Sequence, residues 1–367
     1  MRLLLGVVCT FVISATFALQ VYGAPGESIV LDPNTGDYQI TYLGTGSPGN
    51  KKNKPLRKTT FVPATKINPA IDSSFKWRGA DAVAYSYRVK NGSTSRQPLD
   101  SLFFDPVSDI VSAVPLPKRN EDVDINTIAQ IDKIGRDSLT TPRGWDGSAV
   151  TSDDGGLRVG WVFAKLNTST KGLIAGSTQD GFGFFSKDIP GIGIAQLSGY
   201  SPILGYDDEG PSGEIGDQLN KLTQNDFVTR NVAVPTIVAP VPFDAAVLLD
   251  RIRTHVATWS GKQLLDSAYA AQLDRYLAAA ANAYRLNQPK VGREQIDSVR
   301  RMLDHEHKYL DHDDEDHDDT PEHKAATRMT IDRLAARVLD FDLRYVLKRT
   351  EKEHEHDHDE GSKRKER

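Results

Sequence analysis

The hydrophobic pattern changes its period once along the chain, near residue 240, and this change constrains the fold more than any other feature. Before it, apolar and polar residues alternate in short runs, which is typical of half-buried β-strands. After it, apolar residues recur every three or four positions, as in amphipathic helices. Residues 232–243, VAVPTIVAPVPF, lie between the two patterns, and their three prolines predict an extended connector. We therefore expect an α+β protein with its two kinds of structure in separate domains.

The clearest alternating run lies at residues 81–91, where valines and tyrosines share one face. Asn91-Gly92 then favours a tight hairpin turn into a second strand at residues 99–104. Further strands are predicted at residues 38–43, 157–163, 181–185, 194–197 and 203–206. Many short strands without helices between them indicate an antiparallel β-sandwich, Ig-like or jelly-roll-like, over residues 24–231.

Residues 244–350 are predicted to form an antiparallel four-helix bundle. Asp244 suits the N-cap of the first helix, and the fourth helix is expected to begin at Pro321, where proline is tolerated in the first turn. The spacing of three and four in the fourth helix predicts a buried seam made of Ile331, Leu334, Val338, Phe341 and Tyr345. Arg337 is then expected to be exposed.

The helical sequence LLDSAYAAQLDRYLAAAANAYRLNQPKVGREQIDSVRRML, followed by IDRLAARVLDFDLRYVL, resembles the FIVAR/FIMAH-type helical modules of bacterial surface and secreted proteins. The shared features are a Leu-rich helix before a short polar turn, a second amphipathic helix, and a final helix with paired aliphatic residues. An acidic, histidine-rich stretch stands where such modules keep a short Gly-Lys turn. The segments YSYRVKNGSTSRQPLDSLFF and GFGFFSKDIPG are similar to uncharacterised exported bacterial β-domains. These resemblances imply export and carry no activity.

Residues 1–23 are interpreted as a cleaved signal peptide, because Arg2 precedes an apolar run and a Val-Tyr-Gly step that suits signal peptidase. Cys9, the only cysteine, lies inside this segment. The mature chain would therefore contain no thiol, which excludes disulfides and cysteine catalysis. We expect a periplasmic, cell-surface or extracellular protein with no transmembrane segment after the signal peptide is removed.

The stretch from Asp304 to His323 contains ten carboxylates and five imidazoles, offset by the single lysine Lys308. It carries about −9 of charge by side-chain counting, whereas the whole chain carries −5. The rest of the chain is therefore slightly basic, and no single-sign surface predicts nucleic-acid binding. Residues 304–320 are expected to connect the third and fourth helices of the bundle.

Histidine and carboxylate side chains in this stretch, and in the tail motif HEHDHDE at residues 354–360, are candidate metal ligands. The candidate histidines are His305, His307, His312, His317, His323, His354, His356 and His358. Imidazole suits zinc or nickel and carboxylate suits calcium, so weak binding without sharp selectivity is expected. The alternative is a solvated acidic linker that binds nothing. Residues 351–367 are predicted to be a charged disordered tail, which would place the two histidine groups at opposite ends of the fourth helix.

Catalytic motifs are largely missing from the sequence. All nine histidines lie at or after His255, which excludes a Ser-His-Asp site within the β domain. The match to HExxH at residues 354–358 is interpreted as an accident of the His/Asp repeat, because no apolar surroundings accompany it. The carboxylates at residues 207–209, with Glu214, are the candidate acid-base cluster of the β domain, and a solvated loop is the preferred interpretation.

Exposed aromatic residues would favour a carbohydrate-binding surface instead. Trp77 and Trp145 lie in polar, glycine-flanked segments where stacking on a sugar is conceivable, whereas Trp161 belongs to a strand and is expected in the core. The leading interpretation is a non-catalytic binding or scaffold protein with a protein or polysaccharide partner at the cell surface. The alternatives are a metal-sequestering protein and a carbohydrate-binding or polysaccharide-processing protein.

Overall fold

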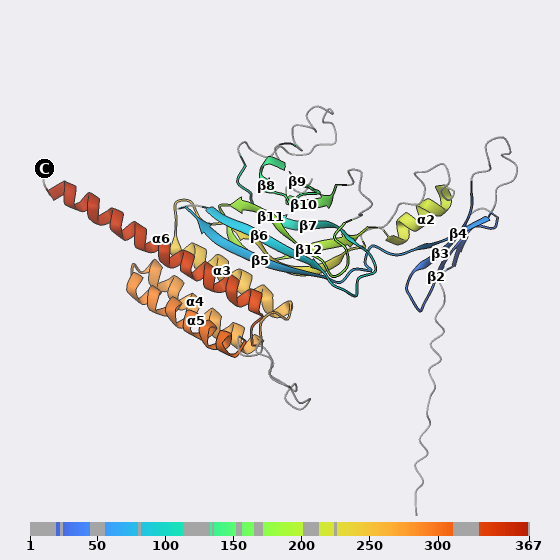
Figure 1. Cartoon of the computed structure of the whole chain (residues 1–367). Coiled ribbons are helices and arrows are strands. Elements are labelled where there is room, and N and C mark those ends of the chain that lie inside the picture. Colours follow the sequence, from blue (N-terminus) through green and yellow to red (C-terminus); the bar gives the residue numbers. More distant parts are fainter. Residues whose placement is uncertain are drawn as a thin grey trace, which may run out of the picture.

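Antiparallel sheets and helices make up the chain, which places the fold in the α+β class (Figure 1). The computed structural model describes residues 20–22, 25–44, 56–79, 82–112, 133, 136–151, 156–164, 172–200, 213–223, 226–310 and 330–365. No helix in these ranges is both long and apolar enough to cross a membrane. The strand predicted at residues 203–206 lies outside them.

A small N-terminal sheet is formed by consecutive antiparallel strands. These are β1 (Gln20–Tyr22), β2 (Ser28–Leu31), β3 (Tyr38–Leu43) and β4 (Leu56–Phe61). Helix α2 (Gly213–Thr223) packs on this sheet through Ile215 and Leu219. The resulting core also contains Ile29, Ile40 and Phe61 and is separate from the main core of the molecule. The described residues between 25 and 231 thus contribute to two hydrophobic cores rather than one.

Two larger antiparallel sheets form the centre of the molecule, and we call them the central sheets. The five-stranded sheet has the order β13 (Val228–Ile237), β12 (Ile189–Gly199), β7 (Leu99–Val107), β10 (Leu157–Phe163) and β9 (Trp145–Thr151). The four-stranded sheet has the order β5 (Pro69–Arg78), β6 (Ala82–Asn91), β11 (Thr178–Ser186) and β8 (Leu139–Thr140). Aromatic rings join the two sheets, with centroids 4.4 Å apart for Tyr87 and Phe104 and 5.6 Å apart for Trp161 and Phe182. The predicted core position of Trp161 is confirmed, since this side chain is 0% exposed.

The hairpin predicted at Asn91-Gly92 is wrong, because β6 and β7 belong to different sheets. A type I′ turn needs positive φ at both central residues, and neither residue has it. The Asn91 side-chain amide instead donates to the carbonyls of Gln97 (3.0 Å) and Leu173 (2.9 Å). This asparagine therefore fixes a crossing between the sheets instead of a tight turn.

The proline-rich residues 232–243 are not a connector throughout, because residues 232–237 belong to β13. Pro235 is accommodated because β13 is an edge strand, where a missing N–H is tolerated. On the free side of this edge, the Ala233 N–H donates to Ser73 Oγ (3.2 Å) and its carbonyl accepts from Tyr87 Oη (2.9 Å). Side chains of the four-stranded sheet thus cover the β13 edge.

The helical region contains α3 (Ala245–Gly261), α4 (Ser267–Arg285), α5 (Pro289–Leu310) and α6 (Arg333–Lys365). The predicted N-cap is confirmed, since Asp244 accepts from the Val247 N–H at 2.9 Å. The predicted start of the fourth helix at Pro321 lies outside the described residues, and residues 330–332 are not helical. Asp332 caps α6 by accepting from the Leu334 N–H at 2.8 Å.

Helix α6 is buried on almost every side over its first four turns. The predicted seam is confirmed at Ile331, Val338, Phe341 and Tyr345, whereas Leu334 is half-buried. The buried set is wider than predicted, because it also contains Ala335, Ala336, Leu339, Leu343, Val346 and Leu347. A helix that is apolar all round is typical of an interior helix. Apolar residues of α6, of the other helices and of the central sheets belong to one continuous core.

Arg337 is not the exposed residue that helical spacing predicted. Its guanidinium donates to the Ser73 carbonyl of β5 at 2.9 Å, lies 3.7 Å from the Asp72 carboxylate and sits over the Phe75 ring at 5.7 Å. These contacts exist because α6 lies against β5, so the side of the helix opposite α3 and α5 also has a partner.

The tail predicted to be disordered is helical as far as residue 365, because α6 continues to Lys365. Extending an existing helix adds one hydrogen bond per residue and avoids the cost of nucleation. Glutamate and lysine in residues 351–353, EKE, are also good helix formers. Figure 1 shows α6 running beyond the other helices toward its C-terminus.

Replacing Asp332 by alanine should lower the free energy of unfolding by about 1 kcal/mol, because the first turn of α6 loses its capping acceptor. Chemical denaturation followed by circular dichroism measures this loss. Glu294→Ala on the exposed face of α5 is the control and should change stability by less than about 0.5 kcal/mol. Equal losses for the two variants would contradict the assignment of Asp332 as the cap.

An ion pair joins the N-terminal sheet to the central sheets. Both guanidinium nitrogens of Arg96 donate to Asp37, at 2.9 and 2.6 Å, and the Asp37 side chain is only 4% exposed. Arg96→Ala should cost about 1–3 kcal/mol, because a buried carboxylate loses its donors. Amide exchange should then accelerate in β2 and β3 and remain unchanged in β10. Uniform acceleration in all three strands would show that the pair does not act locally.

Candidate functional site

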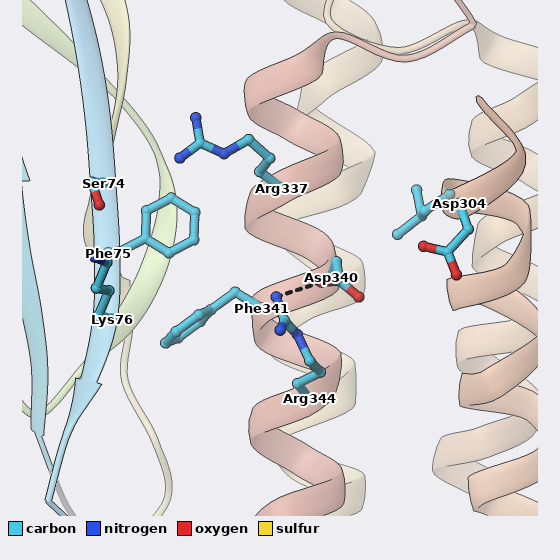
Figure 2. A pocket seen from close by; sticks show the side chains of 9 residues that line it. Ser74, Phe75, Lys76, Asp304, Arg337, Asp340, Phe341 and Arg344 are labelled. Carbon is cyan, nitrogen blue, oxygen red and sulfur yellow. Dashed lines mark ion pairs between the residues drawn. The ribbon is translucent and has the colours of Figure 1, made fainter. Parts of the chain in front are cut away.

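A hollow lies where β5 faces α5 and α6 (Figure 2). Its volume is about 250 Å³. It is lined by Ser74, Phe75, Lys76, Leu303, Asp304, Arg337, Asp340, Phe341 and Arg344. In Figure 2 the rings of Phe75 and Phe341 point toward each other from β5 and α6, and their centroids are 5.2 Å apart. The floor is thus aromatic and the rim is charged.

Arginine side chains hold the carboxylate at the centre of this rim. Arg300 Nε lies 3.0 Å from Asp340 Oδ1, and Arg344 lies 2.6 Å from Asp340 Oδ2. Both oxygens of Asp340 therefore have cationic partners, one from α5 that joins the two helices and one from α6 itself. The rim can therefore contact a polar ligand electrostatically, but Asp340 is not placed to act as a general base.

A second, larger hollow of about 610 Å³ continues along the same edge of β5. It shares Ser74 and Arg337 with the first, and Asn231 and Asp332 also line it. The two hollows together form a polar furrow between the edge strand and α6, which we call the β5–α6 furrow. Arg337 crosses it by donating to the Ser73 carbonyl, so α6 partly covers the edge of the sheet.

The carboxyl group of Asp342 is buried in α6. The residue is 1% exposed, and neither carboxylate oxygen has a hydrogen-bond partner among the described residues. Burial raises the pKa of Asp342 well above its ordinary value, because a charged carboxylate is poorly solvated in the core. Burial raises the pKa of Tyr85 in β6 well above its ordinary value, and electrostatic interactions with Tyr87, Asp342 and Asp188 add to this effect.

Asp188, between β11 and β12, is a second buried carboxyl group. Ser108 Oγ donates to Asp188 Oδ2 at 2.6 Å, and Tyr85 Oη donates to the Asp188 carbonyl at 2.9 Å. Burial raises the pKa of Asp188, and the neighbouring charge of Asp109 adds to this effect, whereas the hydrogen bond from Ser108 opposes it. The hydrogen bond from Ser108 joins the connection between β11 and β12 to the segment that follows β7, so the role of Asp188 is structural.

His255 of α3, which is not one of the predicted metal ligands, lies against β12 of the central sheets. A side chain at Gly191 of β12 would meet Thr236 Oγ1 at 2.1 Å and His255 Nδ1 at 3.2 Å, so α3 approaches the strand closely at this glycine. Burial and the positive charge of Lys262 lower the pKa of His255. The neutral imidazole is therefore favoured in the folded protein.

The predicted metal ligands are only partly described. His305 is exposed on α5, and position 307 lies in the same helix. His312, His317 and His323 lie outside the described residues, while positions 354, 356 and 358 lie in α6. Within the described part of the chain, no three His, Cys, Asp or Glu side chains are grouped closely enough to hold a metal ion.

The aromatic residues proposed to stack on sugar have protein partners instead. Trp77 stacks on Phe341 and Tyr345 of α6, with centroid distances of 4.9 Å in each case. Trp145 is 7% exposed and packs edge-on against Phe163 and Phe182. Both indole rings are therefore used in packing within the protein.

The proposed carboxylate cluster is not brought together in the described residues. Glu214 is exposed on α2, the helix that packs on the N-terminal sheet. Residues 207–209 lie outside the described ranges. The glycine pairs at residues 181–183 and 191–193 lie in β11 and β12.

The β5–α6 furrow and Asp342 were both missed by reasoning from the sequence. The furrow depends on a contact between β5 and α6 that joins positions far apart in the chain. A signal for Asp342 was present, because it stands among apolar residues in the sequence RVLDFDLRYVL. Nearly continuous apolar character predicts a helix buried on all sides, and any carboxyl group within such a helix is a candidate buried acid.

Comparison with known proteins identifies no relative of this chain: no family model, no curated protein and no solved structure matches it.

Proposed function

We propose that this is an exported, non-catalytic binding or scaffold protein, in which the central sheets form a β-sandwich and α3–α6 form a four-helix bundle of the FIVAR/FIMAH type. The observation that carries the proposal is the division of α6 into two parts. Its first four turns are held in the core, and the same helix continues as a highly charged segment to Lys365. We call residues 351–365 the helical arm.

A helix that is anchored in the core at one end is suited to hold a binding surface in a fixed position at the other end. The 33 residues of α6 span about 50 Å at 1.5 Å per residue, and the buried half fixes the direction in which the other half leaves the body. Binding surfaces placed on fixed elements lose less conformational entropy on association than surfaces on free chains. The proposed partner is a protein or polysaccharide of the cell surface, which the helical arm and the β5–α6 furrow would contact.

The proposal is tested with the mature protein on a panel of insoluble envelope polysaccharides and peptidoglycan. We expect retention on one of these materials without release of soluble saccharides. A variant that ends at Thr350 should keep the unfolding midpoint of the full chain and lose most of the retention. Release of saccharides above the buffer blank would overturn the non-catalytic function. Unchanged retention of the shortened variant would overturn the role of the helical arm.

Divalent-metal binding is the second candidate, and the helical geometry of the arm favours it. Positions 354 and 358 are one turn apart in α6, so they share a face, whereas position 356 lies on the opposite side. Two imidazoles at this spacing are a familiar pair of zinc ligands. A pair without a third protein ligand would bind zinc or nickel weakly, in keeping with a sequestering role.

Calorimetric zinc titration of single alanine variants tests this candidate. His354→Ala and His358→Ala should each weaken binding roughly tenfold or more, because each removes one of two ligands. His356→Ala is the matched control, with the same loss of imidazole on the other side of the helix, and should have little effect. Equal effects of all three variants would indicate charge attraction instead of a chelating pair.

A further inference from the structure

Asp342 lies where α6 is enclosed by other elements. Helix α6 contacts α3 and α5 on one side and β12 and β13 on the other. Its aromatic residues Phe341 and Tyr345 stack on Trp77 of β5. The side chain that follows Phe341 is therefore a carboxyl group in the junction between the helical region and the central sheets, with 1% of its surface exposed.

The tyrosine hydroxyl groups of β6 near this junction donate their hydrogen bonds to backbone carbonyls and not to Asp342. Tyr85 of β6, which is electrostatically coupled to Asp342, donates its hydroxyl proton to the Asp188 carbonyl at 2.9 Å. Tyr87, also on β6, donates to the Ala233 carbonyl. Burial raises the pKa values of both tyrosines, so their side chains remain neutral and add no charge beside Asp342.

The cations of the helices beside α6 have other partners as well. On α3, Arg251 donates to the Val238 carbonyl, and Arg253 bonds to Asp274 and Asp250. On α5, Arg300 pairs with Asp340. His255 of α3 faces Gly191 of β12 and favours its neutral form. Arg230 of β13 donates to the Pro69 carbonyl. None of these contacts neutralises a charge at Asp342.

We propose that Asp342 is a proton-operated latch: its protonated form holds α6 against the central sheets, and loss of the proton loosens the helical region from them. A neutral carboxyl group costs far less to bury than an unpaired carboxylate. The ionised state can regain solvation only by movement of α6, because neither oxygen has a donor in the closed arrangement. This inference is independent of the proposed binding function.

The direction of the pH effect follows from linkage. A raised pKa in the folded state means that folded protein binds more protons than unfolded protein at pH values between the unfolded and folded pKa. The stability that Asp342 contributes is therefore fully present below the unfolded pKa of 3.8 and is lost as pH rises through the folded pKa. His255 acts in the opposite direction, because its lowered pKa removes stability as pH falls through 6.5.

The latch is tested by comparing wild type with Asp342→Asn, so that effects of His255 and Asp188 cancel. Denaturant unfolding at several pH values between 5 and 8 gives the ratio of their unfolding equilibrium constants. We expect the unfolding equilibrium constant of wild type, divided by that of the variant, to rise with pH. Within the titration range of Asp342 the rise should be up to about tenfold per pH unit. Asp340→Asn is the control, since its carboxylate is already paired, and should give no such trend. A pH-independent ratio for Asp342→Asn would overturn the proposal.

A second measurement uses wild type alone and does not depend on the folding of a variant. Carbon-detected NMR of the labelled carboxyl groups should show that Asp342 keeps its proton at pH values at which exposed aspartates are ionised. Hydrogen exchange should show α6 amides opening more often as pH rises, after correction for intrinsic exchange rates, with β10 amides as the internal reference. Ionisation of Asp342 in the same pH range as the exposed aspartates, or equal pH trends in α6 and β10, would overturn the latch.

Discussion

Phe341→Ala should lower the free energy of unfolding by about 4 kcal/mol, which is in the range for a large aromatic side chain removed from a core. Phe341 is 4% exposed and contacts aromatic rings of β5, with centroid distances of 4.9 Å to Trp77 and 5.2 Å to Phe75. The loss would therefore include the contact between the helical region and the central sheets as well as packing among the helices. Denaturant unfolding followed by tryptophan fluorescence and circular dichroism measures it.

Arg333→Ala is the control for this prediction, because Arg333 is exposed at the start of the same helix and should change stability by less than about 0.5 kcal/mol. A double-mutant cycle with Trp77→Ala isolates the contact between β5 and α6. We expect a coupling free energy of about 1–2 kcal/mol between the two positions. A coupling near zero would contradict the stacked arrangement.

Local periodicity predicted individual elements well in this chain. The alternation at residues 82–91 corresponds to β6, and the cap at Asp244 corresponds to the start of α3. Periodicity contains no information on which strands pair, however. The Asn91-Gly92 turn failed as a prediction because the asparagine side chain bonds to the distant Leu173 carbonyl, an interaction that no local pattern encodes.

The sequence predicted that the β-strands and the helices form separate domains, whereas their apolar residues share one continuous core. The reason is again that local patterns do not encode distant contacts. Residues 232–237 look like a linker because they contain proline, yet their aliphatic side chains complete a strand. Helix α6 looks amphipathic if only the spacing from Ile331 to Tyr345 is read. The intervening Leu339 and Leu343 are also apolar, and they show that a second face of the helix is buried.

The sequence composition showed which types of residue could form a site, but it did not show where these residues lie in the fold. The histidines stand out in the sequence, and positions 354 and 358 lie within α6. The β5–α6 furrow could not be predicted, because it requires the edge of β5 to meet α6 across more than two hundred residues of sequence. Contacts of such separation are set by packing rather than by local propensity.

The isolated helical region, residues 244–365, should lose the cooperative unfolding transition of the full chain. Separation would expose the face of α6 that packs on β5 and β12, including Phe341 and Tyr345. Exposed apolar surface of this kind removes burial energy of about 25 cal/mol per Å² and promotes association.

Differential scanning calorimetry and sedimentation at several concentrations test this prediction. We expect the full chain to unfold the helical region and the central sheets in one transition, because one continuous core links them. The fragment should show a broad transition or self-association. Replacing Phe341 and Tyr345 by glutamine in the fragment should reduce the association, because it removes the exposed rings. A monomeric fragment with a sharp transition at the midpoint of the full chain would show that the helices fold as an independent domain.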